Sequence, residues 1–179
     1  MSGYKQAVII FEGPDMTGKT NIALNLSSAI KAPYFKNKNE FTSFEGDKDY
    51  FRNVLKYGVP YLLDYIKQTE SGAIFDRQYP TEWVYSRAFK RETYPEILKI
   101  VDEAFASLGT KIILCSRSDY TNIYDDRFPD RLGPHKLAEI DALYDEFAAW
   151  TACKTHRLNV DDGNIEREVY ECIKFVCAT

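Results

Sequence analysis

The sequence predicts a three-layer α/β/α domain with a parallel sheet of about five strands. Short apolar segments recur along the chain and alternate with longer segments of helical periodicity. The apolar segments do not alternate with polar residues, which indicates strands that are buried on both faces. The chain has 179 residues, with no internal repeat or linker, so we expect one domain over residues 1–179.

Composition and charge narrow the classes of partner. Hydrophobic residues make up 45% of the chain and charged residues 28%, which is ordinary for a globular protein. The formal net charge is −4, and the chain has no run rich in lysine or arginine. A small-molecule substrate is therefore favoured over polymeric DNA, although local positive charge in a cleft would still allow a DNA substrate.

The chain shows no sequence feature of a membrane or secreted protein. Its apolar runs are too short to cross a bilayer, and the N-terminus lacks the apolar segment of a signal peptide. The four cysteines have neither zinc-ligand nor redox-motif spacing. We therefore expect reduced thiols, no membrane association and a cytoplasmic location.

The first predicted strand ends at a glycine-rich turn that leads into the first predicted helix. Gly13, Gly18, Lys19 and Thr20 fill every fixed position of the phosphate-binding loop G-x-x-x-x-G-K-[ST]. In such a loop the backbone N–H groups point at phosphate oxygens, the lysine reaches the β- and γ-phosphates, and the hydroxyl binds Mg²⁺. We therefore predict a P-loop NTPase fold that uses ATP and Mg²⁺, with Thr20 as a metal ligand. The predicted ATP-binding residues are Gly13, Thr17, Gly18, Lys19, Thr20 and Asn21.

The other elements follow from apolar runs, turn residues and prolines. A kink or break is expected near Tyr57–Tyr61, because Gly58 and Pro60 fall inside the second predicted helix. A segment at about 120–133 is dense in charge and turn residues, which predicts a mobile loop or a short lid. The predicted strands are 7–11, 33–36, 73–75, 111–115 and 156–160. The predicted helices are 18–31, 48–68, one from 80, 95–108, 134–150 and one after 163.

A carboxylate and a guanidinium stand at the end of the third predicted strand, where open α/β sheets place their ligands. Asp76 is suited to hold Mg²⁺ through water or to approach an acceptor oxygen. Arg77 is suited to bind a phosphate group with two hydrogen bonds. A purely structural ion pair at a strand end is the alternative. The pair favours a kinase over the GTPases and ATP-driven motors that share the phosphate-binding loop.

Two segments resemble the thymidylate kinase family. Residues 11–20, FEGPDMTGKT, are similar to the family's loop F-E-G-x-D-G-x-G-K-[ST]. Residues 76–85, DRQYPTEWVY, are similar to its D-R-Y-x-x-S-x-x-A-Y segment. The order of helices and the length also agree, so the resemblance covers most of the chain. It implies a deoxynucleotide kinase with the P-loop fold, and a bacteriophage-type member is one form that we consider.

The resemblance implies roles in acceptor binding for four matching residues. Arg77 would hold the acceptor's phosphate, and Asp15 would lie near the deoxyribose. Thr81 and Tyr85 would lie beside the base and the sugar. The chain departs from the family at two positions, where Met16 replaces a glycine and Gln78 replaces a tyrosine. The base pocket is therefore not expected to be restricted to thymine, and a 5-hydroxymethyl pyrimidine is an alternative.

A looser alignment adds further residues to the predicted site. Lys36 is expected to contact phosphate, Arg52 to bind the acceptor phosphate and Phe51 to stack on the base, although a place in the core is favoured for Phe51. In the predicted lid, Arg127 and Arg131 are four residues apart and would share a helical face. Lid closure would bring their charge to the transferring phosphoryl group, whereas a salt-bridged surface loop is the alternative.

Together these features predict a nucleotide kinase that transfers phosphate from ATP to a pyrimidine deoxynucleoside monophosphate, dTMP or a 5-modified dUMP. The alternatives are a kinase for a 5-hydroxymethyl pyrimidine in DNA, a deoxynucleoside kinase and a non-catalytic nucleotide-binding module. The expected partner is a small-molecule nucleotide, and the family resemblance implies a homodimer. The expected location becomes the host cytoplasm if the protein is viral. The predicted catalytic residues are Lys19, Asp76, Arg77, Arg127 and Arg131.

Overall fold

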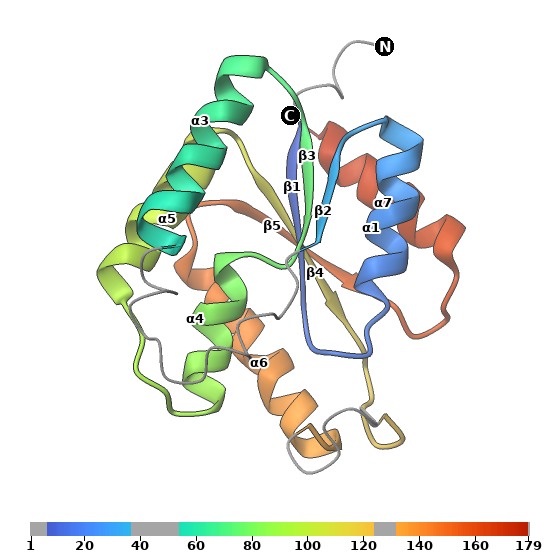
Figure 1. Ribbon diagram of the computed structural model, residues 1–179. Coiled ribbons are helices and arrows are strands. Elements are labelled where there is room, and N and C mark those ends of the chain that lie inside the picture. The colour runs from blue at the N-terminus through green and yellow to red at the C-terminus, as the bar shows by residue number, and fades with distance from the viewer. Residues whose placement is uncertain (1–6, 37–53, 124–131, 179) are drawn as a thin grey trace.

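The computed structural model describes residues 7–36, 54–123 and 132–178, which form a sheet of five parallel strands with helices on both faces (Figure 1). The order of strands across the sheet is β2-β3-β1-β4-β5. This arrangement confirms the predicted three-layer α/β/α fold and the parallel sheet of about five strands. The strands are β1 (Val8–Glu12), β2 (Tyr34–Lys36), β3 (Ala73–Asp76), β4 (Lys111–Ser116) and β5 (Lys154–Asn159).

The helices divide into two layers, which Figure 1 shows on opposite sides of the sheet. One layer consists of α1 (Lys19–Ile30) and α7 (Ile165–Cys177). The other consists of the π-helical turn η2 (Val54–Gly58), α3 (Val59–Thr69), α4 (Tyr79–Ala88), α5 (Pro95–Ser107) and α6 (Pro134–Trp150). In the described part of the chain, no helix is both long and apolar enough to cross a membrane.

The central strand β1 contributes to the core on both faces of the sheet. Ile9 and Phe11 pack in the core beneath α1 and α7, whereas Val8 and Ile10 pack in the core beneath α3 to α6. Because side chains alternate along a strand, Glu12 follows Ile10 onto the α4 and α6 side. The strand therefore delivers a carboxylate to the same side of the sheet as α4.

The element boundaries agree with the sequence prediction except in detail. At the expected break, the chain changes from the π-helical turn η2 to the α-helix α3, with Pro60 in the first turn of α3. Strand β5 begins at Lys154, two residues before the predicted start, because Lys154 and Thr155 also pair with β4. These residues are polar because β5 is an edge strand, so apolar patterning did not reveal them. The start of the predicted helix 48–68 and most of the predicted lid lie outside the described residues.

Candidate functional site

The phosphate-binding loop connects β1 to α1 and requires glycine at its first position. Gly13 has a φ of 134°, and a Cβ atom at this residue would lie 2.1 Å from the carbonyl oxygen of Cys115 in β4. The obstacle is backbone at the centre of the sheet, so it cannot move aside cheaply. Gly18 has a φ of 71° and precedes the first turn of α1. The two motif glycines therefore shape the loop for different reasons, one steric and one conformational.

Met16 adopts a backbone conformation that normally favours glycine. Its φ is 64°, in the left-handed region, and 47% of the residue is exposed. A non-glycine residue in this conformation costs about 1–2 kcal/mol. The carbonyl oxygen of Met16 accepts a hydrogen bond from Nε of Arg117, at 3.2 Å. The loop therefore holds Met16 in a conformation that glycine would adopt more readily, and the residue is half exposed to solvent.

The ammonium group of Lys19 lies inside this loop. Its Nζ donates to the carbonyl oxygen of Pro14 and to Oγ1 of Thr17, the latter at 3.2 Å. Only 6% of Lys19 is exposed. Burial and the nearby charge of Arg77 lower the pKa of Lys19 to about 8. The group is therefore a poorly hydrated cation, suited to exchange these neutral oxygen contacts for phosphate oxygens.

Thr20 and Asp76 meet at the start of α1 and the end of β3. The Thr20 hydroxyl donates to Oδ2 of Asp76 at 2.6 Å, and the Tyr34 hydroxyl donates to the same oxygen at 2.8 Å. Lys36 donates to Oγ1 of Thr20 at 3.3 Å, and its Nζ lies 3.9 Å from Asp76 Oδ2. Lys36 thus contacts the proposed metal-binding pair, and its predicted phosphate contact stays a prediction.

The donor set of Thr20 and Asp76 suits Mg²⁺, which prefers oxygen ligands and keeps several water molecules. Magnesium in kinases usually takes one or two protein ligands and completes its shell with substrate phosphates. Among the residues that the structure describes, no group of three or more His, Cys, Asp or Glu residues could hold a metal ion by itself. A site that depends on bound nucleotide is therefore the arrangement that these residues favour.

The four residues predicted for the acceptor are brought together around Arg77. Its Nη2 donates to Oδ1 of Asp15 at 2.6 Å and to the Tyr85 hydroxyl at 3.4 Å. Its Nη1 donates to Oγ1 of Thr81 at 3.3 Å. Tyr85 in turn donates to Oδ2 of Asp15 at 3.0 Å. Residues from the phosphate-binding loop, the end of β3 and α4 therefore form one cluster, which we call the Arg77 cluster.

The backbone directs Arg77 toward this cluster. The residue has a φ of 72°, and its N–H donates to the carbonyl oxygen of Phe11 at 3.0 Å. This left-handed turn ends β3 against the neighbouring strand β1 and leads directly into α4. Burial alone would raise the pKa of Asp15, but Arg77 and Lys19 lower it below its usual value. Asp15 is therefore an ionised partner for Arg77 at neutral pH.

Glu12 completes the Arg77 cluster and was not assigned a role from the sequence. This fully buried carboxylate accepts hydrogen bonds from the Gln78 N–H at 2.7 Å, Thr81 Oγ1 at 2.8 Å and the Tyr144 hydroxyl at 2.9 Å. Its Oε2 lies 3.7 Å from Nη1 of Arg77. Burial raises the pKa of Glu12, while Arg77 opposes that shift. In the sequence, the only indication of a role for Glu12 was its place as an acidic residue at the end of an otherwise apolar strand.

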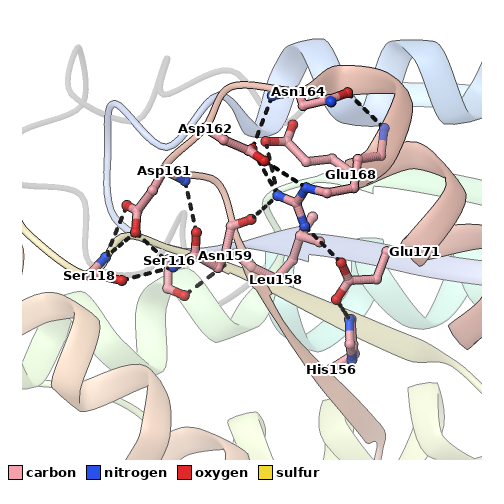
Figure 2. A network of polar contacts seen from close by, with 11 residues as sticks. Ser116, Ser118, His156, Leu158, Asn159, Asp161, Asp162, Asn164, Glu168 and Glu171 are labelled. Carbon is pink, nitrogen blue, oxygen red and sulfur yellow. Dashed lines mark hydrogen bonds and ion pairs between the residues drawn. The ribbon is translucent and has the colours of Figure 1, made fainter.

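A second polar network lies at the ends of β4 and β5 (Figure 2). The Asp161 carboxylate accepts from the Ser118 N–H at 3.0 and 3.2 Å, and Asn159 Nδ2 donates to Oγ of Ser118 at 2.9 Å. Arg117, which precedes Ser118, supports the phosphate-binding loop through its bond to Met16. The loop is therefore held at Asp15 by the Arg77 cluster and at Met16 by Arg117, from the segment that follows β4.

Four predicted site residues, Phe51, Arg52, Arg127 and Arg131, lie outside the described residues, so their roles stay predictions. The two ends of the predicted lid, residues 120–123 and 132–133, are described. Tyr120 and Leu132 are both buried in the core beneath α3 to α6. The predicted lid segment therefore starts and ends at anchored positions.

Two solved structures share the fold of this chain over nearly its whole length. No family model and no curated protein matches the sequence. A crystal structure of YorR protein from Bacillus subtilis, in complex with phosphorylated GDP, is 21% identical with a TM-score of 0.69 and 95% coverage of both chains. A thymidylate kinase structure from Ehrlichia chaffeensis is 12% identical with a TM-score of 0.65, covering 95% of this chain and 98% of that one. The chain thus has the fold of a P-loop nucleotide kinase.

Proposed function

We propose that the protein is a kinase that transfers the γ-phosphoryl group of ATP to a pyrimidine deoxynucleoside monophosphate, dTMP or a 5-modified dUMP. The observation that supports this most is the Arg77 cluster beside the phosphate-binding loop. Lys19 of that loop lies close enough to Arg77 for the charge of Arg77 to lower its pKa. Two cationic groups from separate elements therefore converge, as a reaction between two phosphate groups requires.

The residues divide the work of phosphoryl transfer between donor and acceptor. Lys19 and the loop N–H groups hold the ATP phosphates, and Arg77 exchanges its bond to Asp15 for the acceptor's phosphate. Thr20 and Asp76 hold Mg²⁺, which neutralises charge on the ATP phosphates when bound. An acceptor phosphate oxygen then bonds to the γ-phosphorus as the bond to the departing ADP oxygen breaks. Lys19 and Arg77 stabilise the charge on the migrating group.

The proposed preference for a pyrimidine acceptor rests on residues 76–85, the segment that resembles thymidylate kinases, and on where α4 places them. Thr81 and Tyr85 stand one helical turn apart on α4, and both contact Arg77. A sugar and base that extend from a phosphate on Arg77 would therefore run along this face of α4. Met16 and Gln78 differ from the thymidylate kinase pattern, which is why modified pyrimidines belong to the proposal. A guanine nucleotide must also be tested, because the similar YorR structure contains phosphorylated GDP.

A transfer assay with labelled ATP and Mg²⁺ tests this function. The acceptors are the deoxynucleoside monophosphates, 5-hydroxymethyl-dUMP, free thymidine and DNA containing hydroxymethyluracil. We expect label on a pyrimidine monophosphate. Label on dGMP, on thymidine or on DNA alone would reject the proposed acceptor and retain the kinase chemistry. ATP binding without transfer to any acceptor would reject the enzyme in favour of a nucleotide-binding module.

Two lysine variants make the assay specific to the site. Lys19→Ala should abolish transfer, because no other described loop side chain supplies a cation at the donor phosphates. Lys67→Ala removes an exposed lysine on α3 and should retain wild-type activity. Full activity in the Lys19 variant would overturn the proposed mechanism.

A further inference from the structure

We propose that Tyr34 is a positioning residue that orients Asp76 toward Mg²⁺. The inference rests on the proposed function in one respect, because it takes Thr20 and Asp76 as the groups that hold the metal ion of Mg²⁺–ATP. Metal-binding carboxylates are usually held by further hydrogen bonds, and loss of such a bond typically weakens metal binding or activity 10–100-fold. Tyr34 supplies a bond of this kind to Asp76, at 2.8 Å.

The position of Tyr34 follows from the alternation of side chains in β2. Phe35 points to the α3 side and stacks on Phe75, with ring centroids 5.3 Å apart. Tyr34 and Lys36 therefore point to the α1 side, and Tyr34 packs at the edge of the core beneath α1 and α7. Lys36 pairs with Asp76 in the sheet register, so Tyr34 approaches that carboxylate from one pleat away. Its ring is held by packing while its hydroxyl reaches Asp76.

The three groups around Asp76 differ in what they could do once a metal ion is bound. The Thr20 hydroxyl donates to Asp76 through its hydrogen, which leaves an oxygen lone pair for the metal. Lys36 donates to that same Thr20 oxygen, so it occupies one of the two lone pairs and places a positive charge beside the metal position. Tyr34 donates its own hydrogen to Asp76, so this bond does not occupy a lone pair of the Thr20 oxygen and is compatible with the bound ion. Asp76 is only 3% exposed, so water has little access to replace this bond.

The substitution Tyr34→Phe isolates the hydroxyl, because the ring that packs against the core is retained. Calorimetry would measure ATP affinity with saturating Mg²⁺ and with EDTA, giving the factor by which Mg²⁺ strengthens ATP binding. We expect this factor to fall about tenfold in the variant, while ATP affinity in EDTA stays unchanged. The Mg²⁺ concentration for half-maximal transfer should rise by a similar factor. Tyr170→Phe, on an exposed tyrosine of α7, is the matched control and should change neither quantity.

The outcomes separate this inference from the proposed function. An unchanged Mg²⁺ factor in Tyr34→Phe, with normal ATP binding, would overturn the role of Tyr34 alone. Equal losses of ATP affinity with Mg²⁺ and with EDTA would also overturn it, because they would show that Tyr34 only shapes the loop. If wild-type protein bound ATP no better with Mg²⁺ than with EDTA, the assignment of Thr20 and Asp76 would fail, and the inference with it.

Discussion

Two arginines lie at the centres of separate polar networks, and they differ in burial. The side chain of Arg77 is 9% exposed and contacts Asp15, Thr81 and Tyr85. Arg167, in α7, has a side chain that is 37% exposed. It donates to the Asp162 carboxylate at 3.0 Å, the Asn159 carbonyl oxygen at 2.8 Å and Glu171 at 3.0 Å; these three partners are labelled in Figure 2. Each arginine therefore donates to three neighbouring residues.

Their energetics differ because water is available to only one of them. An exposed ion pair contributes little, since each charge is already hydrated when the pair breaks and salt screens the attraction. A buried charge that loses its partner has no such replacement. We therefore expect loss of Arg77 to reduce both stability and substrate binding. Loss of Arg167, with its bonds to Asp162, Asn159 and Glu171, should reduce stability only slightly.

The largest expected effect is that of Arg77→Ala. The variant leaves Glu12 and Asp15 without their common cation, and breaking a buried pair typically costs about 3–5 kcal/mol. For a chain of this length the melting temperature should fall by about 10 °C. Thermal unfolding measures the stability. Initial rates should show that the KM for the acceptor rises more, relative to wild type, than the KM for ATP. If the melting temperature and the acceptor KM both equalled those of the wild type, the claim that the buried Arg77 cluster governs stability and acceptor binding would be wrong.

Tyr144→Phe should have the next largest effect. It removes one hydrogen bond to the buried carboxylate of Glu12, which typically costs about 1.5–3 kcal/mol. Urea unfolding would measure the loss, and Tyr170→Phe, which alters an exposed hydroxyl, is the control. Equal stability of the two variants would show that Glu12 does not depend on this bond.

The pH dependence of ATP use tests the environment of Lys19. Burial and Arg77 lower its pKa to about 8 from the ordinary value of 10.5, so the free enzyme loses this charge as the pH rises through 8. We expect kcat/KM for ATP to fall about tenfold for each pH unit above 8, because kcat/KM reports the free enzyme. At saturating ATP the bound phosphates favour the charged form, so kcat should persist to higher pH. A kcat/KM that stays constant to pH 10 would contradict the lowered pKa.

The smallest effect is expected for Arg167→Gln. Its bonds to Asp162 and Asn159 are exposed and its bond to Glu171 is partly buried, so water can replace most of them. Its Nη2 also lies 3.8 Å from the buried carboxylate of Glu168, a longer contact than the ion pair of Arg77 with Asp15 at 2.6 Å. The melting temperature should drop much less than in Arg77→Ala, and the difference from wild type should shrink at high salt. A drop as large as that of Arg77→Ala would mean that burial is not what separates the two networks.

The sequence predicted the parts of the site that lie within contiguous motifs. The phosphate-binding loop and Asp76-Arg77 are short patterns whose chemistry depends on local spacing, and the structure brings these two segments together. The strands were predicted because their apolar runs reflect burial on both faces. The start of β5 was placed too late, since the first residues of this edge strand are polar.

Residues whose roles depend on distant partners could not be found in this way. Glu12 and Tyr144 are separated by 132 positions, so no local pattern relates them. Tyr34 looks like any aromatic residue of a short strand until the register of β2 on β3 places its hydroxyl on Asp76. Arg117 looks like an isolated surface charge until the fold brings it to the carbonyl oxygen of Met16.

The position of β1 at the centre of the sheet constrains when the chain can fold during its synthesis. Among the described strands, β1 is made before its two neighbours, β3 and β4, and β4 ends at Ser116. Such non-local pairing slows folding and leaves strand edges exposed in incomplete chains. The turn at Gly13 also lies against Cys115, so a nascent chain without β4 lacks the backbone that bounds the loop. The phosphate-binding loop can therefore take its final shape only after β4 has been made and has paired with β1.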